Sequence, residues 1–93
     1  MTYELGFLEE ALKEWQKLDA TVRDQFKSKL AERLKNPKVP AARLGGQSDR
    51  YKIKLRSTGF RLVYEVRDGQ LIVIVVAAGK RERNAVYKAA AKR

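Results

Sequence analysis

Hydrophobic positions follow two different periods along this chain, a helical one near the start and an alternating one in the second half. Apolar side chains recur three or four positions apart in residues 8–18, and at every fourth position in residues 22–34. These spacings place the apolar side chains on one face of a helix, so they predict two consecutive amphipathic helices. Asn36-Pro37 should end the second helix, because proline disfavours the helical conformation of the residue before it.

Alternating apolar and polar residues predict a sheet of four strands. The strands are expected near residues 3–7, 50–56, 60–67 and 70–78. Ser57-Thr58-Gly59 is interpreted as a turn and Asp68-Gly69 as a two-residue hairpin loop. The run Leu71–Val76 is apolar on both sides, which is typical of a buried central strand.

A basic helix is expected over residues 80–93, so the predicted order of elements is β-α-α-β-β-β-α. This order predicts an α+β fold. An antiparallel four-stranded sheet would carry the N-terminal helical hairpin on one face, and a short helix would follow at the C-terminal end. A chain of 93 residues has no room for a second core, so residues 1–93 are expected to form a single domain.

The composition restricts the chemistry that the chain can perform. There is no cysteine and no histidine, which excludes disulfides, thiolate catalysis and cysteine-rich zinc sites, and removes the commonest metal ligand. We therefore expect no metal and no cofactor, and any catalysis must use Tyr, Lys, Arg, Asp or Glu.

Positive charge is concentrated in the second half of the chain. Residues 1–46 contain nine basic and seven acidic residues, whereas residues 47–93 contain twelve basic and four acidic ones, within a formal charge of +10. A nucleic acid, or an acidic segment of a protein partner, is the expected ligand of the second half. A membrane is a weaker candidate because the run 71–78 is too short to span a bilayer as a helix. Without a signal-peptide pattern, the chain is expected to be cytoplasmic.

Four of these cations are expected to share one face of the sheet. Side chains alternate along a strand, so Lys52, Lys54, Arg56 and Arg61 point away from the apolar face. Lys54 or Arg56 could lie opposite Arg61, since both registers keep the apolar faces together. Like charges facing each other destabilise a sheet, so this arrangement indicates a shared anion such as a nucleic-acid backbone.

Three segments together resemble the RelE toxins of bacterial toxin–antitoxin systems, which form a superfamily with the ParE toxins. The segments are Tyr51-Lys-Ile-Lys-Leu-Arg56, Gly59-Phe-Arg-Leu-Val-Tyr64 and Gly79-Lys-Arg-Glu-Arg83 with Val86-Tyr87. The resemblance implies a ribosome-dependent mRNA interferase, an endonuclease that cleaves A-site mRNA on the 70S ribosome through 2′-hydroxyl attack. It also implies a RelB-like antitoxin, and a complex that represses its own operon, with operator DNA bound only through the antitoxin complex.

The same resemblance implies a set of catalytic residues. They are Lys52, Lys54, Arg61, Arg81 and Tyr87. Lys52, Lys54 or Tyr87 would take the proton of the 2′-hydroxyl, and Arg61 and Arg81 would hold the scissile phosphate. The basic residues expected to contact RNA or the ribosome are Arg50, Arg56, Lys80 and Arg83.

Other interpretations of these residues remain open. Lys52 and Lys54 could form a solvated strand face, and Tyr87 could anchor a helix in the core. A ParE-like toxin would inhibit gyrase instead of cleaving RNA, although the pairing of Lys52 and Lys54 with Arg81 and Tyr87 favours the RelE type. A non-enzymatic basic module that binds RNA or DNA would lose affinity steeply with salt.

Overall fold

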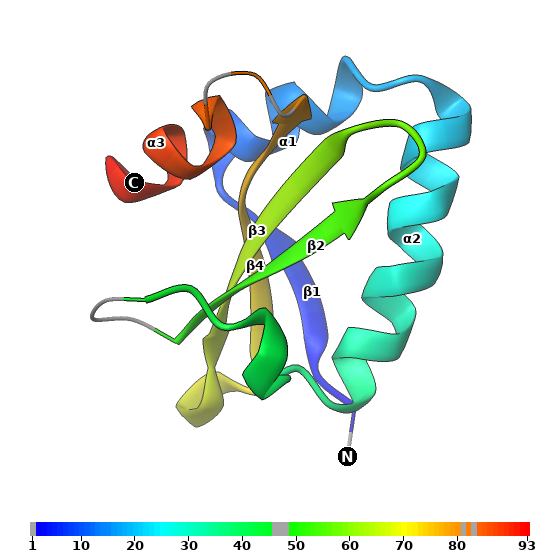
Figure 1. The fold of residues 1–93 in the computed structure, drawn as a ribbon. Coiled ribbons are helices and arrows are strands. Elements are labelled where there is room, and N and C mark those ends of the chain that lie inside the picture. The colour runs from blue at the N-terminus through cyan, green and yellow to red at the C-terminus, as the bar shows by residue number, and fades with distance from the viewer. Residues whose placement is uncertain (1, 46–48, 81, 83) are drawn as a thin grey trace.

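A four-stranded sheet organises the fold, and helices lie on both of its faces (Figure 1). This computed structural model describes residues 2–45, 49–80, 82 and 84–93. The strands and α-helices are β1 (Glu4–Phe7), α1 (Glu9–Gln16), α2 (Ala20–Lys35), β2 (Arg50–Leu55), β3 (Phe60–Arg67), β4 (Ile72–Lys80) and α3 (Ala85–Ala91). Two short 3-10 helices lie in the connections, η1 (Pro40–Ala42) and η2 (Asp68–Gln70).

The sheet is mixed, so the predicted antiparallel arrangement is wrong, while the α+β class is confirmed. Its strand order is β1-β4-β3-β2. β1 runs parallel to β4, with Glu4 opposite Ile72 and Phe7 opposite Val75, and the other two pairs are antiparallel. Parallel neighbours require a long crossover connection, and the helical hairpin with β2 and β3 provides it. The two 3-10 helices also make the order of elements differ from the predicted one.

The β2–β3 hairpin follows the sequence pattern closely. Lys54 lies opposite Arg61, which is one of the two registers that the pattern allowed. Gly59 closes the turn with a φ of 75°, a conformation that glycine adopts without steric cost. The hairpin thus turns Tyr51, Ile53, Leu62 and Tyr64 towards one face, and the cations together with Val63 towards the other.

The connection between β3 and β4 is wider than the predicted two-residue loop. It forms η2, after which Leu71 adopts a left-handed conformation with φ 53°. The Tyr3 hydroxyl donates a 2.7 Å hydrogen bond to the Asp68 carboxylate, which also pairs with Lys38. These contacts with distant segments fix the loop, and β4 starts two residues later and ends two residues later than expected.

The main core lies between the helical hairpin and the apolar face of the sheet. Trp15 and Phe26 from the helices pack with Leu62 and Tyr64 of β3 and Val75 of β4. On the opposite face, α3 covers part of the sheet through a smaller cluster. Its buried members are Val63, Val76, Ala77, Val86 and Ala90. Within the part of the chain that the structure describes, no helix combines the length and apolar character needed to cross a membrane.

Candidate active site

Three cations project from the sheet face on which α3 lies, and we call them the basic face: Lys52 and Lys54 of β2, and Arg61 of β3. Lys54 is the direct cross-strand partner of Arg61, and Lys52 lies opposite Val63. Val63 is fully buried in the cluster beneath α3. The sequence prediction of a shared face is therefore confirmed for these three cations, whereas Arg56 lies in the turn after β2. α3 is the element that lies on the same face.

The cations of the basic face have no acidic partners among the described residues, whereas other cations of the chain do. The described ion pairs belong to Lys38, Arg43, Arg50, Arg67 and Arg93. No described carboxylate forms a salt bridge with Lys52, Lys54 or Arg61. Neighbouring like charges repel one another across a ladder. An anion bound at the basic face would therefore be stabilised by every cation that it contacts.

Arg61 differs from the two lysines because its side chain is buried. Its relative exposure is 7%, and Nη1 donates a 3.1 Å hydrogen bond to the backbone oxygen of Phe60. A guanidinium group carries five N–H donors in a rigid plane, so this one bond leaves most of the fork available. The burial fixes its orientation, which suits a group that must hold a phosphate in a defined position.

The neighbouring cations lower the pKa of the Lys54 ammonium below its ordinary value. The charge of Lys52 is the largest cause, followed by partial desolvation and then by the charges of Arg61 and Arg56. A lower pKa gives a larger fraction of neutral amine at a given pH. Lys54 is therefore better able to accept a proton at a given pH than an ordinary lysine side chain.

Tyr87 lies on α3, half-buried against the cluster that contains Val63. The helix begins after Asn84, which has a left-handed φ of 59°. It approaches the sheet closely at Gly79, where an added Cβ would meet Val86 Cγ2 at 3.4 Å. Tyr87 thus packs against the cluster on the face of the sheet that carries Lys52.

The other predicted basic residues have different surroundings. Arg50 donates through Nε to Glu65 at 3.1 Å and through Nη1 to the backbone oxygen of Ala90, so it ties β2 to α3. Lys80 is exposed, with its ammonium 5.9 Å from the centroid of the Phe60 ring. Arg81 and Arg83 lie outside the described residues.

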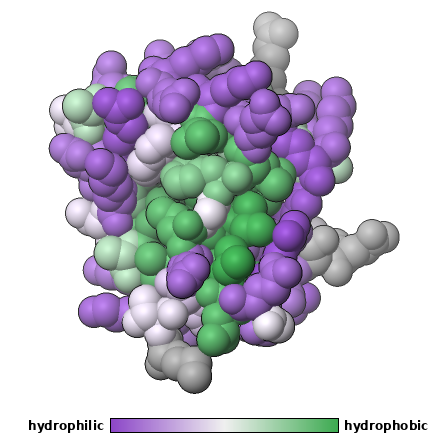
Figure 2. Space-filling view, turned by 180° about the vertical axis from the view of Figure 1, so that it is seen from behind, coloured by the Kyte–Doolittle hydropathy of each residue, from purple (hydrophilic) through white to green (hydrophobic). Residues whose placement is uncertain are grey.

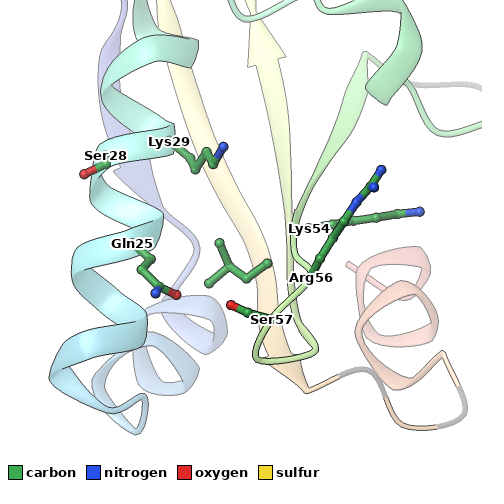
Figure 3. Close-up of a pocket in the computed structure, with 7 residues that line it drawn as sticks. Gln25, Ser28, Lys29, Lys54, Arg56 and Ser57 are labelled. Carbon is green, nitrogen blue, oxygen red and sulfur yellow. The ribbon is translucent and has the colours of Figure 1, made fainter.

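A hollow that the sequence analysis did not identify adjoins the basic face (Figure 3). It has a volume of about 550 Å³ and lies between α2 and the end of β2. Its lining residues are Gln25, Ser28, Lys29, Lys54, Leu55, Arg56 and Ser57. Lys29 points from α2 towards the hollow, while Lys54 and Arg56 extend away from α2 (Figure 3). The only available signal was the outward helical position of Lys29, which many solvated lysines share.

The described residues show no group of three or more carboxylate side chains that could hold a metal ion. The site as described thus consists of ammonium, guanidinium and phenol groups. Such groups can bind a phosphate, stabilise charge that develops on it, and transfer protons.

Comparisons with known proteins agree on one family of toxins. The family model described as ParE toxin of type II toxin-antitoxin system, parDE, matches residues 5–85. A putative RelE-like toxin protein of Escherichia coli is 57% identical, and the mRNA interferase toxin RelE of Escherichia coli K12 is 56% identical. Both alignments cover 100% of this chain and 98% of the relative.

Solved structures give the same result at the level of the fold. The Escherichia coli toxin RelE (R81A/R83A) mutant in the free state superposes with a TM-score of 0.92 at 54% identity. The same mutant in complex with an antitoxin RelBc peptide has a TM-score of 0.84 at 54% identity. Both comparisons cover 100% of this chain and 98% of the solved chain.

Proposed function

This chain belongs to the RelE-like toxins of type II toxin–antitoxin systems and is an mRNA interferase, and from that premise we propose that it cleaves mRNA in the ribosomal A site. The basic face is the observation that carries this proposal. Lys54 faces Arg61 across the β2–β3 ladder, and no described carboxylate neutralises either one. A phosphodiester entering between them would supply the missing negative charge.

The residues of the site can be given roles in a phosphoryl transfer. The neutral amine of Lys54 takes the proton of the RNA 2′-hydroxyl, whose oxygen then attacks the adjacent phosphorus. Arg61 and Arg81 hold the non-bridging oxygens and stabilise the charge that develops on them. The bond to the 5′-oxygen breaks, and the Tyr87 phenol donates a proton to that leaving oxygen. The products are a 2′,3′-cyclic phosphate and a 5′-hydroxyl end.

The ribosome supplies what this set of groups lacks. Free RNA seldom holds its 2′-hydroxyl in line with the leaving oxygen, and orientation alone can account for about 7–11 kcal/mol of a reaction barrier. The broad positive charge of residues 47–93 favours docking on ribosomal RNA. We assign Arg50, Arg56, Lys80 and Arg83 to these RNA contacts, together with the hollow beside Lys54.

The role of Lys54 predicts a pH dependence with a defined sign. Cleavage should accelerate with rising pH and level off below the ordinary pKa of lysine, because neighbouring charges lower the pKa of Lys54. Replacing Lys52 by methionine removes the largest cause of the shift. The pKa of Lys54 then rises and the ascending limb should move to higher pH, as single-turnover cleavage on programmed ribosomes would show.

Lys88→Met provides the matched control for this pH profile, since Lys88 is an exposed lysine on α3. Its profile should superpose on that of the wild-type protein. An ascending limb that stays in place in Lys52→Met would exclude Lys54 as the proton acceptor.

Primer extension on one mRNA, with and without programmed ribosomes, tests the proposed function. Cuts confined to the A-site codon and dependent on ribosomes are expected. Cuts in free RNA would indicate an autonomous ribonuclease and would overturn the requirement for the ribosome.

A gyrase-directed toxin is the second candidate, because the matching family model is described as a ParE toxin. The two functions separate in one further assay. Inhibition of DNA supercoiling by purified gyrase, together with intact mRNA on ribosomes, would favour this second candidate over the first.

An antitoxin of the RelB type is the partner that the surface of this toxin fits. Figure 2 shows a hydrophobic area framed by hydrophilic side chains on the side of the molecule where the edge strand β1 lies. Three large apolar side chains of the described chain, Leu5, Leu12 and Leu71, are each 39% exposed. An acidic, amphipathic segment would bury such apolar side chains while its carboxylates meet the surrounding cations.

Regulation and location follow from the same proposal. With its antitoxin bound, the toxin would repress its own operon, and it would contact operator DNA only through that complex. Residues 1–93 would act as one toxin domain in the cytoplasm, where ribosomes and mRNA are found.

A further inference from the structure

β4 extends beyond the strand that pairs with its outer side. β1 reaches only as far as Phe7 opposite Val75, and the Leu8 N–H closes this ladder with a 3.0 Å bond to the Val75 oxygen. From Val76 to Lys80, no described strand lies on that side of β4. Buried backbone groups need hydrogen-bond partners, so side chains must replace the missing strand here.

Glu14 of α1 and Arg93, which follows α3, supply those partners. Glu14 Oε1 accepts a 3.2 Å hydrogen bond from the Ala78 N–H, and Arg93 Nη1 donates a 2.9 Å bond to the Val76 oxygen. The two side chains also bind each other through two bonds, with Nη1 to Oε1 at 2.7 Å and Nη2 to Oε2 at 3.1 Å. This bidentate geometry is the strongest form of an arginine–carboxylate pair.

The surroundings of the pair strengthen it further. The side chain of Arg93 is only 16% exposed, and its Nε lies 3.0 Å from Glu10, so two carboxylates of α1 hold one guanidinium. Arg93 thereby joins three elements, namely α1, the free side of β4 and the end of α3.

Of these three elements, β4 and α3 lead to the active site. β4 ends at Lys80, directly before Arg81, and α3 carries Tyr87. The smaller cluster buries five described side chains, which is a limited contact for holding a helix in a defined position. A fixed point on both elements at once would set the position of Tyr87 and the direction in which the chain leaves β4.

We propose that Glu14 and Arg93 are positioning residues of the active site, acting through β4 and α3 on the groups that contact the scissile phosphate. The proposal rests on the mRNA-cleaving function argued above. The pair touches no reacting atom. Its contribution is to keep Tyr87 at the distance and angle that proton transfer to the leaving oxygen requires.

Single-turnover cleavage on programmed ribosomes tests the proposal in the 93-residue chain. Arg93→Ala and Glu14→Gln should each lower the cleavage rate at saturating toxin by about ten- to a hundredfold. The toxin concentration that gives half of the maximal rate should change by less than about twofold, since neither residue belongs to the basic face. Arg93→Lys should recover part of the rate, because it restores the charge without the bidentate fork.

The double variant Glu14→Arg with Arg93→Glu restores the attraction between the two side chains, although neither new side chain can repeat the hydrogen bond to β4 that the original residue makes. Its rate should exceed that of either single charge reversal. Arg67→Ala is the matched control, since Arg67 forms a 2.9 Å pair with Glu65 within β3. It should cleave at the wild-type rate.

Two results would overturn the proposal while leaving the proposed function intact. One is a wild-type rate in Arg93→Ala. The other is a loss of cleavage that follows the unfolded fraction measured by circular dichroism at the assay temperature. Failure of the wild-type chain itself to cleave would instead refute the proposed function.

Discussion

Tyr87→Phe is expected to reduce mRNA cleavage by about a hundredfold or more, because proton transfer by a positioned side chain contributes about 10²–10⁴-fold to a rate. The substitution removes one hydroxyl and keeps the ring, so the contacts with the cluster beneath α3 should persist. The mutant should therefore fold as the wild type does and bind ribosomes with similar affinity. Single-turnover cleavage, thermal unfolding and ribosome co-sedimentation would measure the three quantities.

Tyr3→Phe is the control for this substitution. The Tyr3 hydroxyl donates to Asp68 at 2.7 Å, in the connection before β4 and away from the basic face. Its loss should lower the free energy of unfolding slightly and leave cleavage unchanged. A Tyr87→Phe enzyme that cleaves at the wild-type rate would show that Tyr87 serves only to anchor α3.

The elements that could be predicted from sequence are those whose pattern is local. The β2–β3 hairpin is one of these elements. Its alternation of apolar and polar residues, its turn at Gly59 and its cations on one face all follow from residues 50–67 alone. The parallel pairing of β1 with β4 is another matter. The sequence of a four-residue strand does not indicate which strand it pairs with. Its partner lies 68 residues further along the chain, with Glu4 opposite Ile72.

The candidate site likewise contains residues that a local sequence pattern predicts and residues that it does not. The positions of Lys52, Lys54 and Arg61 on one face follow from the two-residue period of a strand, whereas the roles of Arg81 and Tyr87 came from the resemblance to a family. The pair Glu14–Arg93 could not be predicted, since it joins residues 79 positions apart. In the sequence, Glu14 has the position of an ordinary solvated helical carboxylate. It can bind β4 because β1 ends at Phe7 and leaves the Ala78 N–H without a strand partner.

Arg61→Gln is expected to change activity and stability in opposite directions. Cleavage should fall by about 10²–10³-fold, because a fixed donor to the developing charge is lost. Removing a charge that faces Lys54 also relieves repulsion across the ladder, because like charges directly opposite each other destabilise a sheet. That gain in stability should appear as a higher melting temperature in thermal unfolding.

Opposite effects on cleavage and stability would distinguish a functional cation from a structural one on the same strand. Arg67→Gln removes the same charge from the other end of β3, where Arg67 pairs with Glu65. It should lower stability slightly and leave cleavage intact, the reverse of the pattern expected for Arg61. Loss of stability together with retained cleavage in Arg61→Gln would mean that the guanidinium serves the fold and holds no phosphate. A gain of stability together with a loss of cleavage in Arg61→Gln would show that the chain tolerates unpaired cations on this face because the RNA supplies their partner.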